Sequence, residues 1–113
     1  TKAPHFPSWV KYLYGYALTD RGEYDKALNF FETELQKDHA WSGSSQTMYL
    51  LSAFINLKRG DKKKAEELFE KQKALDGKGK TAKQIKGELF GAIDKTFLNE
   101  FLDALAPLGL PQE

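Results

Sequence analysis

Cysteine is absent from this 113-residue sequence, which excludes disulfide bonds and thiol chemistry but does not separate an oxidising from a reducing compartment. Long apolar runs are also missing. None approaches the roughly 20 residues that a bilayer crossing needs, so we expect no membrane span. A net charge of +1 with 41% apolar and 29% charged residues is typical of one soluble globular domain. The compartment is not readable, with a cytoplasmic location slightly favoured.

Residues that perform chemistry are scarce. The two histidines, His5 and His39, lack metal-ligand spacing to each other or to a pair of carboxylates. Residues 77–79 form a glycine-containing stretch that is too short for a phosphate loop and follows no strand. The serines of residues 42–45 read as part of a polar loop. We therefore expect no enzyme activity, no cofactor and no metal site.

Charge is distributed unevenly along the chain. Residues 58–86 carry a net charge of +6 and residues 87–113 a net charge of −4. A nucleic-acid site would interleave such lysines with aromatic or arginine side chains, and here lysine dominates. Glutamates at 66, 67 and 70 also provide partners one helical turn away. We expect a solvated helix face and no nucleic-acid partner.

The stretch over residues 14–31 predicts two helices joined by a tight turn. Gly15 and Ala17 are small enough for another helix to approach, and Gly22 provides a left-handed helix stop. The same pattern returns over residues 53–69 with a constant offset of 38 residues, which indicates a repeated helical hairpin. The equivalent pairs are Gly15 with Ala53, Gly22 with Gly60, Ala27 with Ala65, and Phe31 with Phe69.

The remaining segments are predicted from the spacing of apolar residues and from the residues that start or end helices. Pro4 and Pro7 predict an extended arm over residues 1–8, with Ser8 as an N-cap. The third helix is apolar nearly all round, so we expect neighbours on both of its sides. The first four predicted helices span residues 9–20, 23–37, 46–58 and 62–75, and Ser44 or Ser45 caps the third. A capping box from Thr81 to Gln84 opens a helical segment over residues 81–106, in which we expect a break near Asp94 to Thr96. Residues 107–113 form a tail.

These residues resemble the tetratricopeptide repeat family, whose units are helical hairpins of about 34 residues with small, aromatic and alanine positions in a fixed order. The resemblance covers residues 9–38 and 46–76, with an insertion near residues 41–45. A degenerate third repeat, or capping helices, would follow over 81–106, with Gly91 in register with Gly15 and Ala53. The resemblance implies an all-α fold, a right-handed stack of antiparallel helical hairpins, in a single domain from residue 9 to 113.

In this family the first helix of each hairpin lines a concave surface. The resemblance therefore implies an aromatic and aliphatic groove that lies outside the hairpin core. Its residues would be Trp9, Tyr12, Tyr16, Thr19 and Asp20 from the first copy and Thr47, Leu50, Phe54, Leu57 and Lys58 from the second.

The function that this groove implies is a scaffold for protein–protein interaction, which binds an apolar or amphipathic peptide of a partner. In the alternative interpretation the C-terminal helix fills the groove, since apolar patches of this size are seldom left bare. We also expect that helix to dock against the fourth helix. Self-association, and a regulatory or substrate-presenting role within a larger enzyme, are the other functions left open by the sequence.

Overall fold

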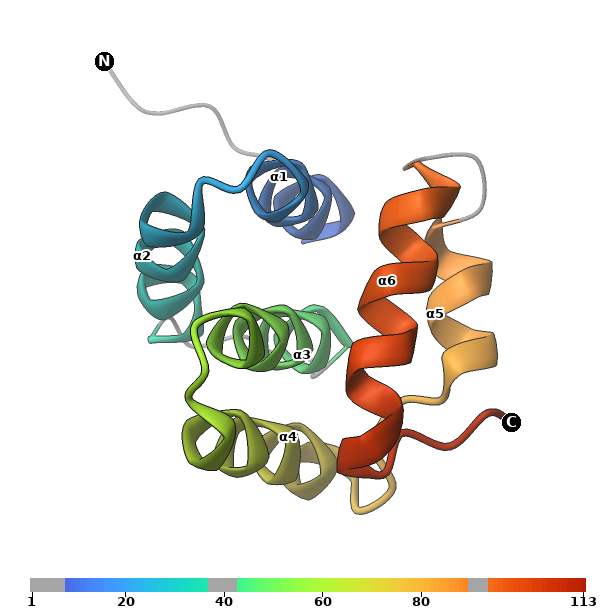
Figure 1. Ribbon diagram of the computed structural model, residues 1–113. Helices are drawn as coiled ribbons and strands as arrows, with labels where there is room; N and C mark the ends of the chain where they lie inside the picture. The colour runs from blue at the N-terminus through green and yellow to red at the C-terminus, as the bar shows by residue number, and fades with distance from the viewer. Residues whose placement is uncertain (1–7, 37–42, 90–93) are drawn as a thin grey trace.

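The computed structural model describes residues 8–36, 43–89 and 94–113, except for the side chains of 8–12, 43–44, 76 and 88–89. All regular elements in these ranges are helical, which confirms the all-α class (Figure 1). None of these helices combines the length and apolarity of a membrane crossing. The elements are α1 (Ser8–Asp20), α2 (Tyr24–Leu35), α3 (Gly43–Lys58), α4 (Lys62–Asp76), α5 (Ala82–Leu89), α6 (Lys95–Leu105) and the 3-10 turn η1 (Ala106–Leu108).

Two helix starts differ from the prediction. Helix α1 includes Ser8, which was expected to precede it as a cap. Helix α3 begins at Gly43, so Ser44 and Ser45 lie within its first turn and their predicted capping role is wrong. The rest of the predicted arm, residues 1–7, the predicted last residue of the second helix, Lys37, and residues 38–42 of the predicted loop lie outside the described residues.

One predicted helix cap and one predicted helix break are confirmed. The Thr81 hydroxyl accepts from the Gln84 amide at 3.1 Å, and the Gln84 side-chain oxygen accepts from the Thr81 amide at 2.8 Å. These reciprocal bonds form the expected capping box of α5. The break before α6 is also confirmed, because the Asp94 carboxylate accepts from the Thr96 amide at 2.6 Å and caps a new helix at Lys95. Residues 90–93, and with them Gly91, lie outside the described part.

The turns from α1 to α2 and from α3 to α4 have the same backbone geometry. Gly22 and Gly60 have φ angles of +77° and +82°, which confirms the predicted left-handed stops. Each turn has the paired bonds of a Schellman motif, and the two sets are 38 residues apart. The amides of Glu23 and Gly22 donate to the carbonyls of Leu18 (2.9 Å) and Thr19 (3.0 Å), and those of Asp61 and Gly60 to the carbonyls of Asn56 (2.8 Å) and Leu57 (3.1 Å).

Small residues allow close packing within each hairpin. A Cβ atom added at Gly15 would lie 2.2 Å from Cε1 of Phe31, so the ring of Phe31 rests directly on the α1 backbone. Ala27 and Ala65 are both fully buried, as their equivalent places in the repeat predict. Ala17 is exposed, so its expected role in close helix approach is wrong.

Helix α3 is the centre of the molecule. It packs against α1, α2, α4 and α6, which confirms the neighbours expected from its all-round apolar sequence (Figure 1). Its polar Gln46 is buried and donates from Nε2 to the carbonyl oxygen of Gln72 at 3.1 Å, which fastens α3 to α4. The α3 side chains buried in the core are Met48, Leu50, Leu51, Ala53, Phe54 and Ile55.

The chain after η1 returns to the start of α5. The carbonyl oxygens of Pro111 and Gln112 accept from the amides of Ala82 at 2.8 Å and Lys83 at 3.1 Å. These amides belong to the first turn of a helix and have no partner within it. Leu110 is buried beside them, so the C-terminal segment is part of the fold.

We predict opposite effects for two glycine-to-alanine substitutions. Gly15→Ala should cost about 1–3 kcal/mol of unfolding free energy, because the fully buried Phe31 ring would have to move. Gly87→Ala in α5 meets no atom within 4 Å and should be neutral or stabilise by up to about 1 kcal/mol through helix propensity. Denaturant unfolding measures both. Equal effects at the two positions would contradict the close contact at Gly15.

Candidate functional site

The predicted groove across α1 and α3 is covered by α6. In Figure 1, α1 and α3 are seen nearly end-on and α6 runs across both of them. Tyr16 of α1 is 1% exposed and Phe54 of α3 is 0% exposed, because both rings lie against α6. The expectation that these residues lie outside the core is therefore wrong.

Four rings form the contact, and we call Tyr16, Phe54, Phe97 and Phe101 the aromatic cluster. The Tyr16 centroid lies 6.0 Å from that of Phe97 and 5.5 Å from that of Phe101. The corresponding distances for Phe54 are 5.7 and 5.6 Å. All four pairs are edge-to-face, a geometry that contributes about 0.5–1.5 kcal/mol per pair beyond burial alone.

The sequence of α6 explains why this helix lies across the groove. Phe97 and Phe101 are four residues apart, which places both rings on one helical face, where they stack at 6.1 Å. Leu102 and Leu105 are also buried and extend that face. The opposite face carries Asn99 and Asp103, both exposed, and Glu100, also exposed, lies between the two faces. Helix α6 is therefore amphipathic, and its apolar face is directed at α1 and α3.

The other predicted groove residues are divided between core and rim. Thr19 is buried, and its hydroxyl donates to the carbonyl oxygen of Gly15 at 2.8 Å. Leu50 and Thr47 are buried, Leu57 is half-buried, and Asp20 is exposed. The side chains of Trp9 and Tyr12 lie outside the described part.

Lys58 lies at the rim, where α3 ends. Its Nζ is 3.2 Å from Oε1 of Glu100 on α6 and 5.5 Å from the centroid of the Phe54 ring. The contact with Phe54 has the geometry of a cation–π interaction. Lys58 thus contacts the aromatic cluster and Glu100 of α6 at once.

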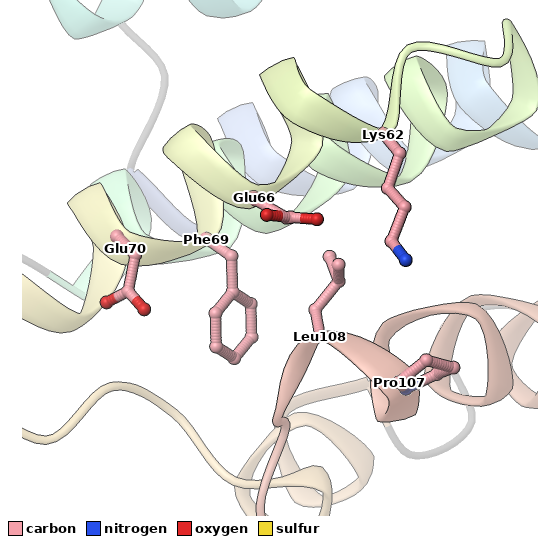
Figure 2. A pocket seen from close by; sticks show the side chains of 6 residues that line it. All are labelled: Lys62, Glu66, Phe69, Glu70, Pro107 and Leu108. Atoms are coloured by element: carbon pink, nitrogen blue, oxygen red, sulfur yellow. The ribbon is translucent and has the colours of Figure 1, made fainter.

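The expected docking of the C-terminal helix on α4 is wrong, because α6 packs on α3 instead. Contact with α4 is made by η1. Figure 2 shows the side chains of Phe69 and Leu108 between these elements, in a hollow of about 310 Å³. Phe69 itself is buried, and most of the other side chains that line the hollow are exposed. The other residues that line it are Lys62, Glu66, Glu70 and Pro107.

A second open hollow lies on the side of α3 formed with α2 and α4. Its volume is about 340 Å³, and its lining mixes half-buried apolar with polar side chains. No group of three or more His, Asp or Glu residues within the described ranges is placed to hold a metal ion. The residues that line this hollow are Leu28, Glu32, Leu35, Gln36, Tyr49, Ser52, Asn56, Lys64, Leu68 and Lys71.

The sequence left two places open for the C-terminal helix, and α6 lies in the groove, as in the alternative interpretation. That Phe97, Phe101 and Glu100 would make the contacts was not predicted. Their spacing on an amphipathic helix was visible, but an apolar helical face does not specify which surface it will cover. Comparison with protein-family models finds no match to this sequence, and comparisons with curated proteins and with solved structures find none either.

We predict that a chain truncated after Gly79 unfolds or aggregates. Truncation removes α5 and α6 and exposes Tyr16 and Phe54, and the loss of one large buried side chain already costs about 3–5 kcal/mol. A small domain has only about 5–15 kcal/mol of stability in total. Circular dichroism during heating measures the transition. A full-length Asn99→Ala variant, altered on the exposed face of α6, should retain it.

A truncated chain that stays soluble and unfolds cooperatively would contradict this prediction. It would show that α6 is not required by the two hairpins.

Proposed function

We propose that this protein is a protein-interaction module whose groove across α1 and α3 binds an amphipathic helix. The observation that carries the proposal is α6 itself, which lies in the groove as such a ligand would. Phe97 and Phe101 occupy the centre of the contact against Tyr16 and Phe54. An amphipathic helix held in an apolar groove by residues one turn apart is a recurrent mode of peptide recognition.

The distribution of polarity supports a binding site. Protein interfaces concentrate their binding energy in buried central aromatic side chains, surrounded by a polar rim. The aromatic cluster supplies such a centre, and the contact between Lys58 and Glu100 lies at its edge. A partner helix with two aromatic residues four positions apart would find the same contacts as α6.

We further propose that the two hairpins stack as in tetratricopeptide repeats. Support comes from the matching Schellman turns 38 residues apart and from the groove being formed by the first helix of each hairpin. In this arrangement α5 and α6 take the place of a third unit. Helix α6 then serves as an intramolecular occupant of the surface that repeats of this kind offer to peptides.

Helix α6 would compete with any partner. A segment tethered to its own site acts at an effective concentration in the millimolar range, which lowers the apparent affinity of a free ligand. A partner must therefore bind more tightly than α6 does, or bind when α6 is weakened. This competition makes the proposal testable with a peptide that copies α6.

Self-association is a second candidate. Helix α6 of one copy would enter the groove of another and make the contacts already present within a single chain. Such an exchange needs no new complementary surface. Sedimentation at several concentrations distinguishes it from a monomer that binds peptides.

We predict that a labelled peptide of residues 94–106 binds a Phe97→Ala/Phe101→Ala chain at least about tenfold more tightly than the unmodified chain, because the tethered competitor is weakened. The peptide should also raise the thermal midpoint of that variant, since a ligand specific for the folded state stabilises it. Fluorescence anisotropy measures the affinity and differential scanning fluorimetry the midpoint.

An Asn99→Ala/Asp103→Ala chain serves as the matched control, because both positions lie on the exposed face of α6 and should leave the affinity unchanged. A peptide with alanine at both Phe positions should not bind. If the variant is too unstable at working temperature, the milder Phe97→Leu substitution replaces it. The absence of peptide binding to folded variants would rule out the groove as a binding site.

A further inference from the structure

We infer that Lys58 is a specificity-determining residue, which selects partner helices carrying an acidic residue between two aromatic anchors. The inference rests on the proposed function and names the chemistry of its ligand. The pattern is an aromatic residue, two variable residues, an acid and a second aromatic residue. On α6 these positions are Phe97, Glu100 and Phe101.

The register of α6 places the acid beside the groove. Glu100 directly precedes Phe101, so its side chain leaves the helix at the edge of the buried face. There its Oε1 lies 3.2 Å from Nζ of Lys58, with 38% of the Lys58 side chain and 53% of the Glu100 side chain exposed. The acid is accessible to solvent but is held at a defined point relative to both rings.

Lys58 is held in place from the groove side. Its Nζ lies 5.5 Å from the centroid of Phe54, which itself contacts Phe97 and Phe101. A ligand that inserts two aromatic side chains against Phe54 therefore brings its intervening turn to the ammonium group. A lysine or arginine at the position of Glu100 would meet a like charge there.

The neighbouring cation does not share this role. The guanidinium of Arg59 pairs with Asp25 of α2, and α2 lies across α3 from α6 (Figure 1). Asp103, the other acid within α6, is exposed, and the ion pair of Lys58 is with Glu100. Position 100 is thus the place on the bound helix where charge should matter, and position 103 provides a control.

Lys58 also has a simpler role to be separated from this one. It occupies the last turn of α3, where a cation interacts favourably with the helix dipole. That role depends on α3 alone and is independent of the charge on the bound helix. Reversal of the charges at positions 58 and 100 together distinguishes the two roles, because it restores the ion pair with the bound helix but not the favourable interaction of a cation with the dipole of α3.

The test measures binding of three labelled peptides of residues 94–106 to the Phe97→Ala/Phe101→Ala chain, with and without Lys58→Glu. The peptides carry the natural sequence, Glu100→Lys or Asp103→Lys, and the last two have equal net charge. We expect Glu100→Lys to weaken binding to the Lys58 chain about two- to tenfold, within the range of exposed ion pairs plus the added repulsion. The Asp103→Lys substitution should change the free energy of peptide binding by less than about half as much.

In the Lys58→Glu chain the preference should reverse, so that the Glu100→Lys peptide binds more tightly than the natural one. The difference in affinity between the natural and the Glu100→Lys peptides should diminish in 1 M salt, where the Debye length is about 3 Å. Equal affinity of all three peptides for the Lys58 chain would overturn this inference while leaving the proposed function intact. Failure of every peptide to bind a chain that circular dichroism shows to be folded would instead reject the proposed function.

The same pair is tested in the intact chain, which does not require a weakened α6. Lys58→Glu and Glu100→Lys should each lower the thermal midpoint, and the double variant should recover part of the loss. Additive losses in the double variant would show that Lys58 serves only the end of α3, and would overturn the inference.

Discussion

The perpendicular packing of the Phe97 and Phe101 rings against Tyr16 and Phe54 is the interaction on which the rest of the molecule depends. Each hairpin has its own internal contacts, such as that of Phe31 with Gly15, but neither hairpin covers the apolar surface that α1 and α3 form together. Helix α6 removes this surface from water. Its position also brings η1 onto α4 and returns the C-terminal segment to the first turn of α5.

The two hairpins show how a short sequence signal produces a repeated structure. A glycine in the left-handed conformation ends α1 and again α3, and the same backbone hydrogen bonds follow each time. In the first copy Gly15 then accepts the ring of Phe31. The equivalent residues of the second copy, Ala53 and Phe69, are both buried in the core.

The contact that stabilises the fold is also the one that resembles ligand binding. A groove that binds an amphipathic helix must be apolar, and an apolar groove of this size would be left exposed without an occupant. In the function that we propose, a tethered helix resolves this conflict, because it protects the surface and would be exchanged for a similar helix of higher affinity. The cost is a lower apparent affinity for partners, in proportion to the stability of the docked α6.

Local signals in the sequence determined the all-helical class, the two equivalent hairpins, the left-handed glycines, the capped start of α5 and the break before α6. These features depend on contacts between residues within a few positions of one another, so periodicity and capping chemistry are sufficient to predict them. The start of α3 was predicted wrongly because residues such as Ser44 and Ser45 suit a cap and a first turn alike. Only the tertiary structure decided that α6 lies on α3 instead of α4, and that Tyr16 and Phe54 belong to the core. An apolar helical face specifies that it will be buried but not against which surface, because the hydrophobic effect has no direction.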